Sequence, residues 1–110
     1  MANQDLQSQY SNYQQIIGTL NDKLSQLDSD LGEHKVVLDS LNKLPEDRRC
    51  WRMVDSSLIE LQCKEARGVL KNRIEGMEKS IKNLSEETHK KQEEFVDWKQ
   101  KNNVRIVKAN

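Results

Sequence analysis

Apolar side chains near the start of the chain recur at alternating spacings of four and three. The row comprises Leu6, Tyr10, Tyr13, Ile17, Leu20, Leu24, Leu27, Leu31, His34, Leu38 and Leu41. This spacing is the heptad pattern of a helix that buries one stripe against a partner helix. Pro45 ends the helix, because it lacks an amide donor and disfavours helical angles at Leu44. We expect a helix over about residues 4–44, roughly 60 Å long at 1.5 Å per residue.

A second heptad row lies in the last third of the chain. Its apolar members are Leu70, Ile74, Met77, Ile81, Leu84, Phe95 and Trp98, and Thr88, Lys91 and Asn102 occupy the same register. Residues 85–92 hold no apolar side chain, so we expect the loosest packing there. The row predicts a second helix over about 64–103, followed by a short C-terminal tail.

The segment between the two rows has a different pattern. Residues 48–54 and 57–62 are short runs in which Trp51, Val54 and Ile59 favour strand, on either side of a turn at Asp55–Ser56. We expect a β-hairpin over about 48–62. A helix continuing from Leu58 to Ala66 remains the alternative.

Two heptad rows joined by a short middle segment fold back as an antiparallel pair. Matching the rows about their centre places Leu41 near Arg67, and Tyr13 near Phe95. Each Leu or Ile buried in such a seam contributes on the order of 1.5–3 kcal/mol. The sequence therefore predicts a mainly α fold, a long antiparallel two-helix coiled coil with a central β-hairpin, as a single domain over residues 1–110.

The predicted hairpin carries more apolar side chains than two helices leading away from it can cover. An isolated two-stranded hairpin is marginal in water, and both of its edges are open to pairing. We therefore predict that it pairs with strands from other chains through Trp51, Met53, Val54, Leu58 and Ile59. Packing of these residues on the helix ends of the same chain is the alternative.

Aromatic residues gather at the opposite end of the predicted helix pair. Exposed apolar patches often mark binding sites. The candidate binding tip comprises Tyr10, Tyr13, Phe95 and Trp98, with Val104 and Ile106 from the tail. The alternative is that the aromatic rings only fill layers of the seam.

Composition excludes several classes of function. Eighteen basic residues balance eighteen acidic ones, so no net charge favours nucleic acid or an anionic membrane. Nowhere do eight apolar residues stand together, and the first residues lack the pattern of a secretory signal. Cys50 and Cys63 match no metal-ligand spacing, which indicates free thiols in the cytoplasm. A disulfide across the hairpin is the alternative.

No arrangement of residues suggests catalysis. His34 and His89 are the only histidines, and Glu33–His34 has no second ligand one helical turn away. The four glycines are isolated and form no phosphate-binding loop. We expect no catalytic, cofactor-binding or metal-binding residues, and a protein that is not an enzyme.

Several short motifs stand out at the centre and near the end of the chain. They are Glu33–His34, Arg49-Cys50-Trp51-Arg52-Met53-Val54 and Leu58-Ile59-Glu60, with Trp98-Lys99 and residues 102–106 further on. In these motifs the chain resembles the eukaryotic prefoldin subunit 2 family, a β-type prefoldin family. The family's turn carries Gly-Gly, whereas this chain has Asp55-Ser56-Ser57. Because a tight two-residue turn needs positive φ, we expect a wider or differently typed turn here.

The resemblance implies a subunit of a hetero-hexamer with two α-type and four β-type subunits. The hairpins would close an intersubunit β-barrel, with the coiled coils projecting from it. Such complexes capture unfolded actin and tubulin without ATP and pass them to the cytosolic group II chaperonin. The five hairpin residues would serve assembly, and the tip residues would face the client. The alternative is a structural coiled-coil adaptor that dimerises and tethers two partners.

Overall fold

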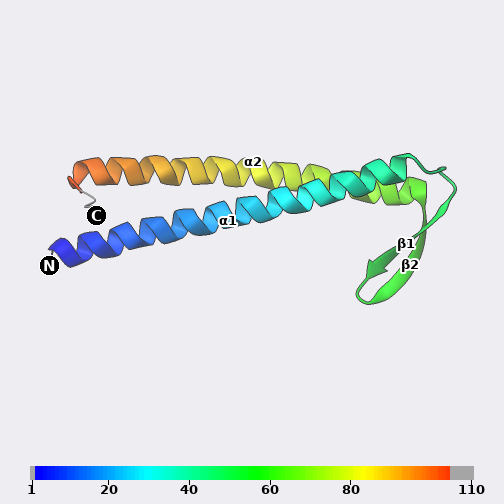
Figure 1. Cartoon of the computed structure of the whole chain (residues 1–110), viewed down its shortest axis with the longest axis horizontal. Helices are drawn as coiled ribbons and strands as arrows, with labels where there is room; N and C mark the ends of the chain where they lie inside the picture. Colours follow the sequence, from blue (N-terminus) through cyan, green and yellow to red (C-terminus); the bar gives the residue numbers. More distant parts are fainter. Residues whose placement is uncertain (1, 105–110) are drawn as a thin grey trace, which may run out of the picture. The chain divides into compact units, whose positions relative to one another are not determined.

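Two long helices flank a β-hairpin in the chain (Figure 1). The structure is a computed structural model and describes residues 2–104. Helix α1 spans Ala2–Asn42, strand β1 spans Arg49–Val54, strand β2 spans Ser57–Gln62, and helix α2 spans Cys63–Lys101. The predicted fold class is confirmed, and the alternative of a helix running from Leu58 to Ala66 is wrong.

The heptad rows coincide with the covered stripe of each helix. Every member of the first row is buried or half-buried, and Leu20 is only 8% exposed. On α2, Ile74 and Thr88 are the most deeply covered members of the row. The Thr88 hydroxyl donates to the Leu84 carbonyl at 2.7 Å, so a polar group occupies a buried layer without losing its hydrogen bond.

Helix α1 ends just before Pro45, as its sequence predicts. The amide of Lys43 donates to the Ser40 carbonyl at 3.3 Å, and the amide of Leu44 donates to the Leu41 carbonyl at 3.1 Å. These shorter-range bonds tighten the last turn and satisfy carbonyls that no following helical turn can reach.

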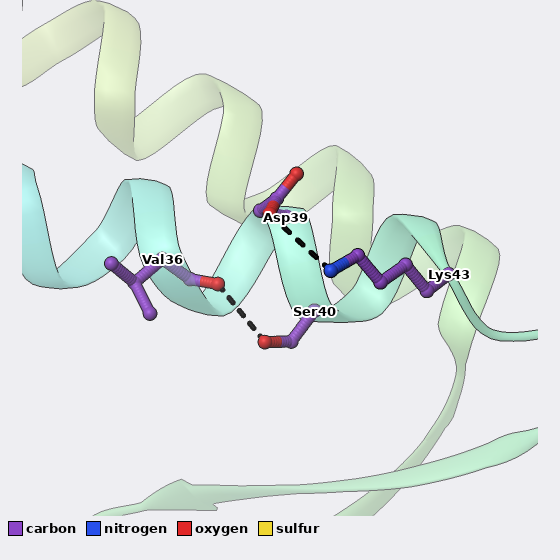
Figure 2. A network of polar contacts seen from close by, with 4 residues as sticks. All are labelled: Val36, Asp39, Ser40 and Lys43. Atoms are coloured by element: carbon purple, nitrogen blue, oxygen red, sulfur yellow. Dashed lines mark hydrogen bonds and ion pairs between the residues drawn. The ribbon is translucent and has the colours of Figure 1, made fainter.

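Near this end of α1, Figure 2 shows two contacts between residues one helical turn apart. The Ser40 hydroxyl donates to the Val36 carbonyl at 3.1 Å, and Lys43 lies 3.8 Å from the Asp39 carboxylate. Both charged side chains are largely exposed, and such pairs contribute little stability. Val36 itself is 66% exposed.

The β-hairpin is antiparallel, with Val54 opposite Ser57 across a two-residue turn. The expectation of a wider or differently typed turn is wrong. Asp55 has φ of 47° and Ser56 has φ of 70°, so both central residues adopt the left-handed conformation of a tight type I′ turn. This turn matches the right-handed twist of the strands, and that match outweighs the cost of positive φ at two non-glycine residues.

The chain divides into two compact units. The hairpin unit comprises residues 26–81 and contains both strands. Over the described residues, the terminal unit comprises 2–25 and 82–104. In the terminal unit, Gln9 contacts Trp98 and Tyr13 lies near Lys91, so the two helices run antiparallel there.

Candidate interaction surfaces

The outward sheet face is formed by Trp51, Met53 and Leu58. Successive side chains of a strand alternate between the two faces, and the register sets Met53 opposite Leu58 and Trp51 opposite Glu60. Trp51, Met53 and Leu58 are each 63% exposed. The hairpin therefore carries an uncovered apolar patch on this face.

The opposite face of the sheet carries the other two predicted assembly residues. Val54 is half-buried and Ile59 is 43% exposed. The predicted assembly set is thus divided between the two faces of the hairpin. The alternative that these residues pack on the helix ends of the same chain is wrong for Trp51, Met53, Leu58 and Ile59, which all remain exposed.

A hollow of about 230 Å³ lies within the hairpin unit, between the hairpin and the adjoining helix segments. The helices and the hairpin both line it, with Val37, Leu41, Ala66, Val69, Leu70 and Arg73 from the helices and Cys50, Trp51, Arg52 and Leu61 from the hairpin. Sequence reasoning missed this hollow. Its one signal is that Val37 and Val69 are apolar although neither belongs to a heptad row.

Cys50 and Cys63 are free thiols at the base of the hairpin, as predicted, and the alternative disulfide is not formed. Cys63 is fully buried, and its amide donates to the Arg48 carbonyl at 2.8 Å. The Cys50 thiol points to the same carbonyl at 4.0 Å. A hydrogen bond with the Cys63 side chain, together with burial, raises the pKa of the Cys50 thiol above its ordinary value.

Four aromatic rings form a cluster in the terminal unit. The Tyr13 and Phe95 rings stack with centroids 5.1 Å apart, and Tyr10 lies 5.4 Å from Phe95. Trp98 lies 5.6 Å from Tyr13 and donates from Nε1 to Gln9 Oε1 at 2.6 Å. The rings fill seam layers, yet each remains half-exposed.

Cations and a second hollow flank the aromatic cluster. Lys99 Nζ lies 4.4 Å from the centre of the Phe95 ring. Lys91 Nζ lies 2.9 Å from the Glu94 carboxylate, and this hydrogen bond raises the pKa of Lys91. The hollow, of about 220 Å³, is lined by Gln9, Asn12, Tyr13, Ile16, Lys91 and Trp98.

The remaining tip residues are placed differently. Ile16, which the sequence reasoning did not include, is 42% exposed beside the cluster. Val104 is half-buried. Ile106 lies outside the described residues.

The described residues also bear on two further properties, metal binding and the crossing of a membrane. Between residues 2 and 104, no group of three or more His, Cys, Asp and Glu side chains is placed to hold a metal ion. His34 Nδ1 lies 2.7 Å from the Asp30 carbonyl in the same helix. Over the same residues, neither helix has the apolar stretch that crossing a bilayer would require.

Comparison with known proteins assigns the family. A family model described as a prefoldin subunit matches residues 4–109. The chain belongs to the prefoldin subunit family. Prefoldins are chaperones, and membership implies assembly with other prefoldin subunits.

Two fungal relatives match this chain over nearly their whole length, whereas a human relative matches it over 57% of its own length. The prefoldin subunit 2 of Saccharomyces cerevisiae is 30% identical over 96% of both chains, and the probable prefoldin subunit 2 of Schizosaccharomyces pombe is 30% identical over 96% of this chain and 92% of that protein. Human prefoldin subunit 2 is 34% identical over 80% of this chain and 57% of that protein.

A solved structure supports the fold. The prefoldin β subunit from Thermococcus strain KS-1 superposes with a TM-score of 0.81, covering 90% of this chain and 87% of that chain at 23% identity. The family model confirms the family to which the sequence points, and this superposition confirms the fold.

Proposed function

We propose that this prefoldin subunit occupies a β-type position in a hetero-hexamer of two α-type and four β-type subunits. Its hairpin contributes strands to a shared β-barrel. The observation that carries the proposal is the exposure of Trp51, Met53 and Leu58 on the outward sheet face. In addition, each of the two strands is paired along one edge only, so its other edge is free.

The energetics of the hairpin favour such an assembly. Covering side chains that are 63% exposed contributes roughly 1–2 kcal/mol each. Strands from neighbouring subunits also pair the free backbone groups along the edges of β1 and β2. Exposed Ile59 and half-buried Val54 lie on the other face of the hairpin, and in a barrel the residues of each strand point alternately inward and outward.

The terminal unit is the proposed client-binding part. The half-exposed aromatic cluster, exposed Ile16 and the hollow between them offer apolar surface to an unfolded chain. We assign Val104 and Ile106 to the same surface. The proposed clients are unfolded actin and tubulin, captured in the cytoplasm without ATP and passed to the group II chaperonin.

Co-purification with the other prefoldin subunits tests the assembly role. The double variant Trp51→Lys and Ile59→Lys places one charge on each face of the sheet, and we expect it to abolish the hexamer. Val36→Lys, at an exposed valine outside the sheet, is the matched control and should assemble normally.

Two results would contradict the assembly role. One is a normal hexamer containing the double variant. The other is a stable homodimer of the unaltered chain that ignores the other subunits, which would favour the structural adaptor.

A further inference from the structure

The side chains that the helices contribute to the hollow of the hairpin unit are apolar except for Arg73. Val37, which lines it, is 49% exposed although it lies one residue from the buried stripe of α1. Val69 and Ala66 approach from α2 and also lie outside the heptad row. Pairing of the two helices therefore does not account for these apolar side chains.

Two arginines line the hollow, Arg52 on β1 and the exposed Arg73 on α2. Arg52 is half-buried. Among residues 5–104, neither Arg52 nor Arg73 forms an ion pair, whereas Arg49 is paired with Glu60 at 2.9 Å. A partly buried cation without a counter-ion favours an anionic partner.

We propose that this hollow receives an apolar segment bearing a carboxylate from a sister prefoldin subunit. The proposal rests on the proposed function, because it extends the same interface: Trp51 both lines the hollow and lies on the outward sheet face. The apolar side chain of the segment contacts Val37 and Val69, and its carboxylate pairs with Arg52 and Arg73.

The charges on this surface favour a different chain over a second copy. Arg52 and Arg73 both belong to this surface, and neither has an acidic partner among residues 5–104. A symmetric contact between two copies repeats the same surface on both sides, so these cations would face one another. A sister subunit with an acidic segment avoids that repulsion and gains charge-assisted pairing.

Two neighbouring valines provide the test. Val36 and Val37 are both exposed on α1, but only Val37 lines the hollow. In reconstitution with purified sister subunits, we expect Val37→Asp to weaken incorporation into the complex about ten-fold and Val36→Asp to leave it unchanged. Circular dichroism of both variants checks that helix content is equal.

A second pair of variants tests the carboxylate. Arg73→Glu reverses the charge at the edge of the hollow and should weaken incorporation comparably, whereas Arg73→Lys should retain most of it. Equal incorporation of Val37→Asp and Val36→Asp overturns the proposal. If Val37→Asp weakens incorporation and Arg73→Glu does not, the assignment of an acidic partner is wrong.

The outcome also separates this proposal from the proposed function. If the two hollow variants assemble normally while the Trp51→Lys and Ile59→Lys double variant does not, the hollow is not an interface and the barrel role stands. If the unaltered chain fails to assemble with its sisters, both proposals are wrong.

Discussion

The guanidinium of Arg67 donates two hydrogen bonds to the carbonyl oxygen of Leu41, 3.1 Å from Nε and 2.8 Å from Nη2. Arg67 also donates to the Leu44 carbonyl. The Leu41 carbonyl belongs to the last turn of α1, where the helix runs out of its own amide donors and its dipole is negative, and the Leu44 carbonyl lies just beyond that end. One side chain near the start of α2 thereby holds the end of α1 within the hairpin unit.

Removing this contact should destabilise the chain. We expect Arg67→Met to lower the free energy of unfolding by about 2 kcal/mol, since partly buried carbonyls lose charge-assisted donors. Urea unfolding followed by circular dichroism measures the change. Arg49→Met is the control, because its ion pair with Glu60 is surface-exposed and should contribute less than about 1 kcal/mol. An equal decrease in the free energy of unfolding for the two variants would show that the Arg67 contact stabilises the chain no more than an exposed ion pair does.

The hairpin turn should be improved by glycine. Ser56 holds φ at 70°, which costs an L-residue roughly 1 kcal/mol, so Ser56→Gly should stabilise the chain by a similar amount. Ser57→Gly, one residue further in β2, should instead destabilise it by about 0.5–1 kcal/mol. Thermal unfolding compares the two variants. A lower melting temperature for Ser56→Gly would contradict the positive-φ turn.

The Cys50 thiol should react slowly with alkylating reagents. Its raised pKa reduces the fraction present as thiolate at any given pH below that of an ordinary cysteine, and the thiolate is the reactive form. The rate of reaction with iodoacetamide should therefore increase at a higher pH than it does for a cysteine with the ordinary pKa. Cys63→Ala removes the main cause of the shift and should speed the reaction. An unchanged pH profile in that variant would mean that Cys63 does not control Cys50.

The aromatic cluster should matter for clients and not for assembly. Phe95→Ser with Trp98→Ser removes two of the four rings, and we expect the assembled complex to suppress client aggregation less well. Light scattering during dilution of a denatured client measures this. Val96→Ser is the control, because Val96 is 49% exposed but forms none of the ring contacts. Undiminished suppression by the double variant would exclude the cluster as the client surface.

The heptad rows made the helices predictable. A row such as Leu20, Leu24, Leu27 and Leu31 has one physical explanation, a covered stripe, and the structure covers these residues. The contact between Leu41 and Arg67 and the stacking of Tyr13 on Phe95 follow from matching the two rows about the hairpin, and both are confirmed. Because the apolar spacing repeats over many turns, one polar residue in the row, such as His34, does not change the prediction.

The hairpin was predictable in position and not in detail. Its turn was misjudged because the glycine rule is local, whereas the twist of the paired strands selects the turn type. The hollow beside it was missed because it depends on how the sheet face carrying Arg52 and Leu61 approaches the helices. Sequence periodicity describes one helix or strand at a time. It shows that Val37 and Val69 are apolar residues outside the heptad rows, but not that they line the same hollow.

The central claim is that the uncovered sheet face of this prefoldin subunit is completed by strands of other subunits. Native mass spectrometry of the complex purified through this chain tests it directly. The expected result is a particle of six subunits containing several different prefoldin chains. A single species of 12.9 kDa, or a homodimer of the chain alone, would contradict it.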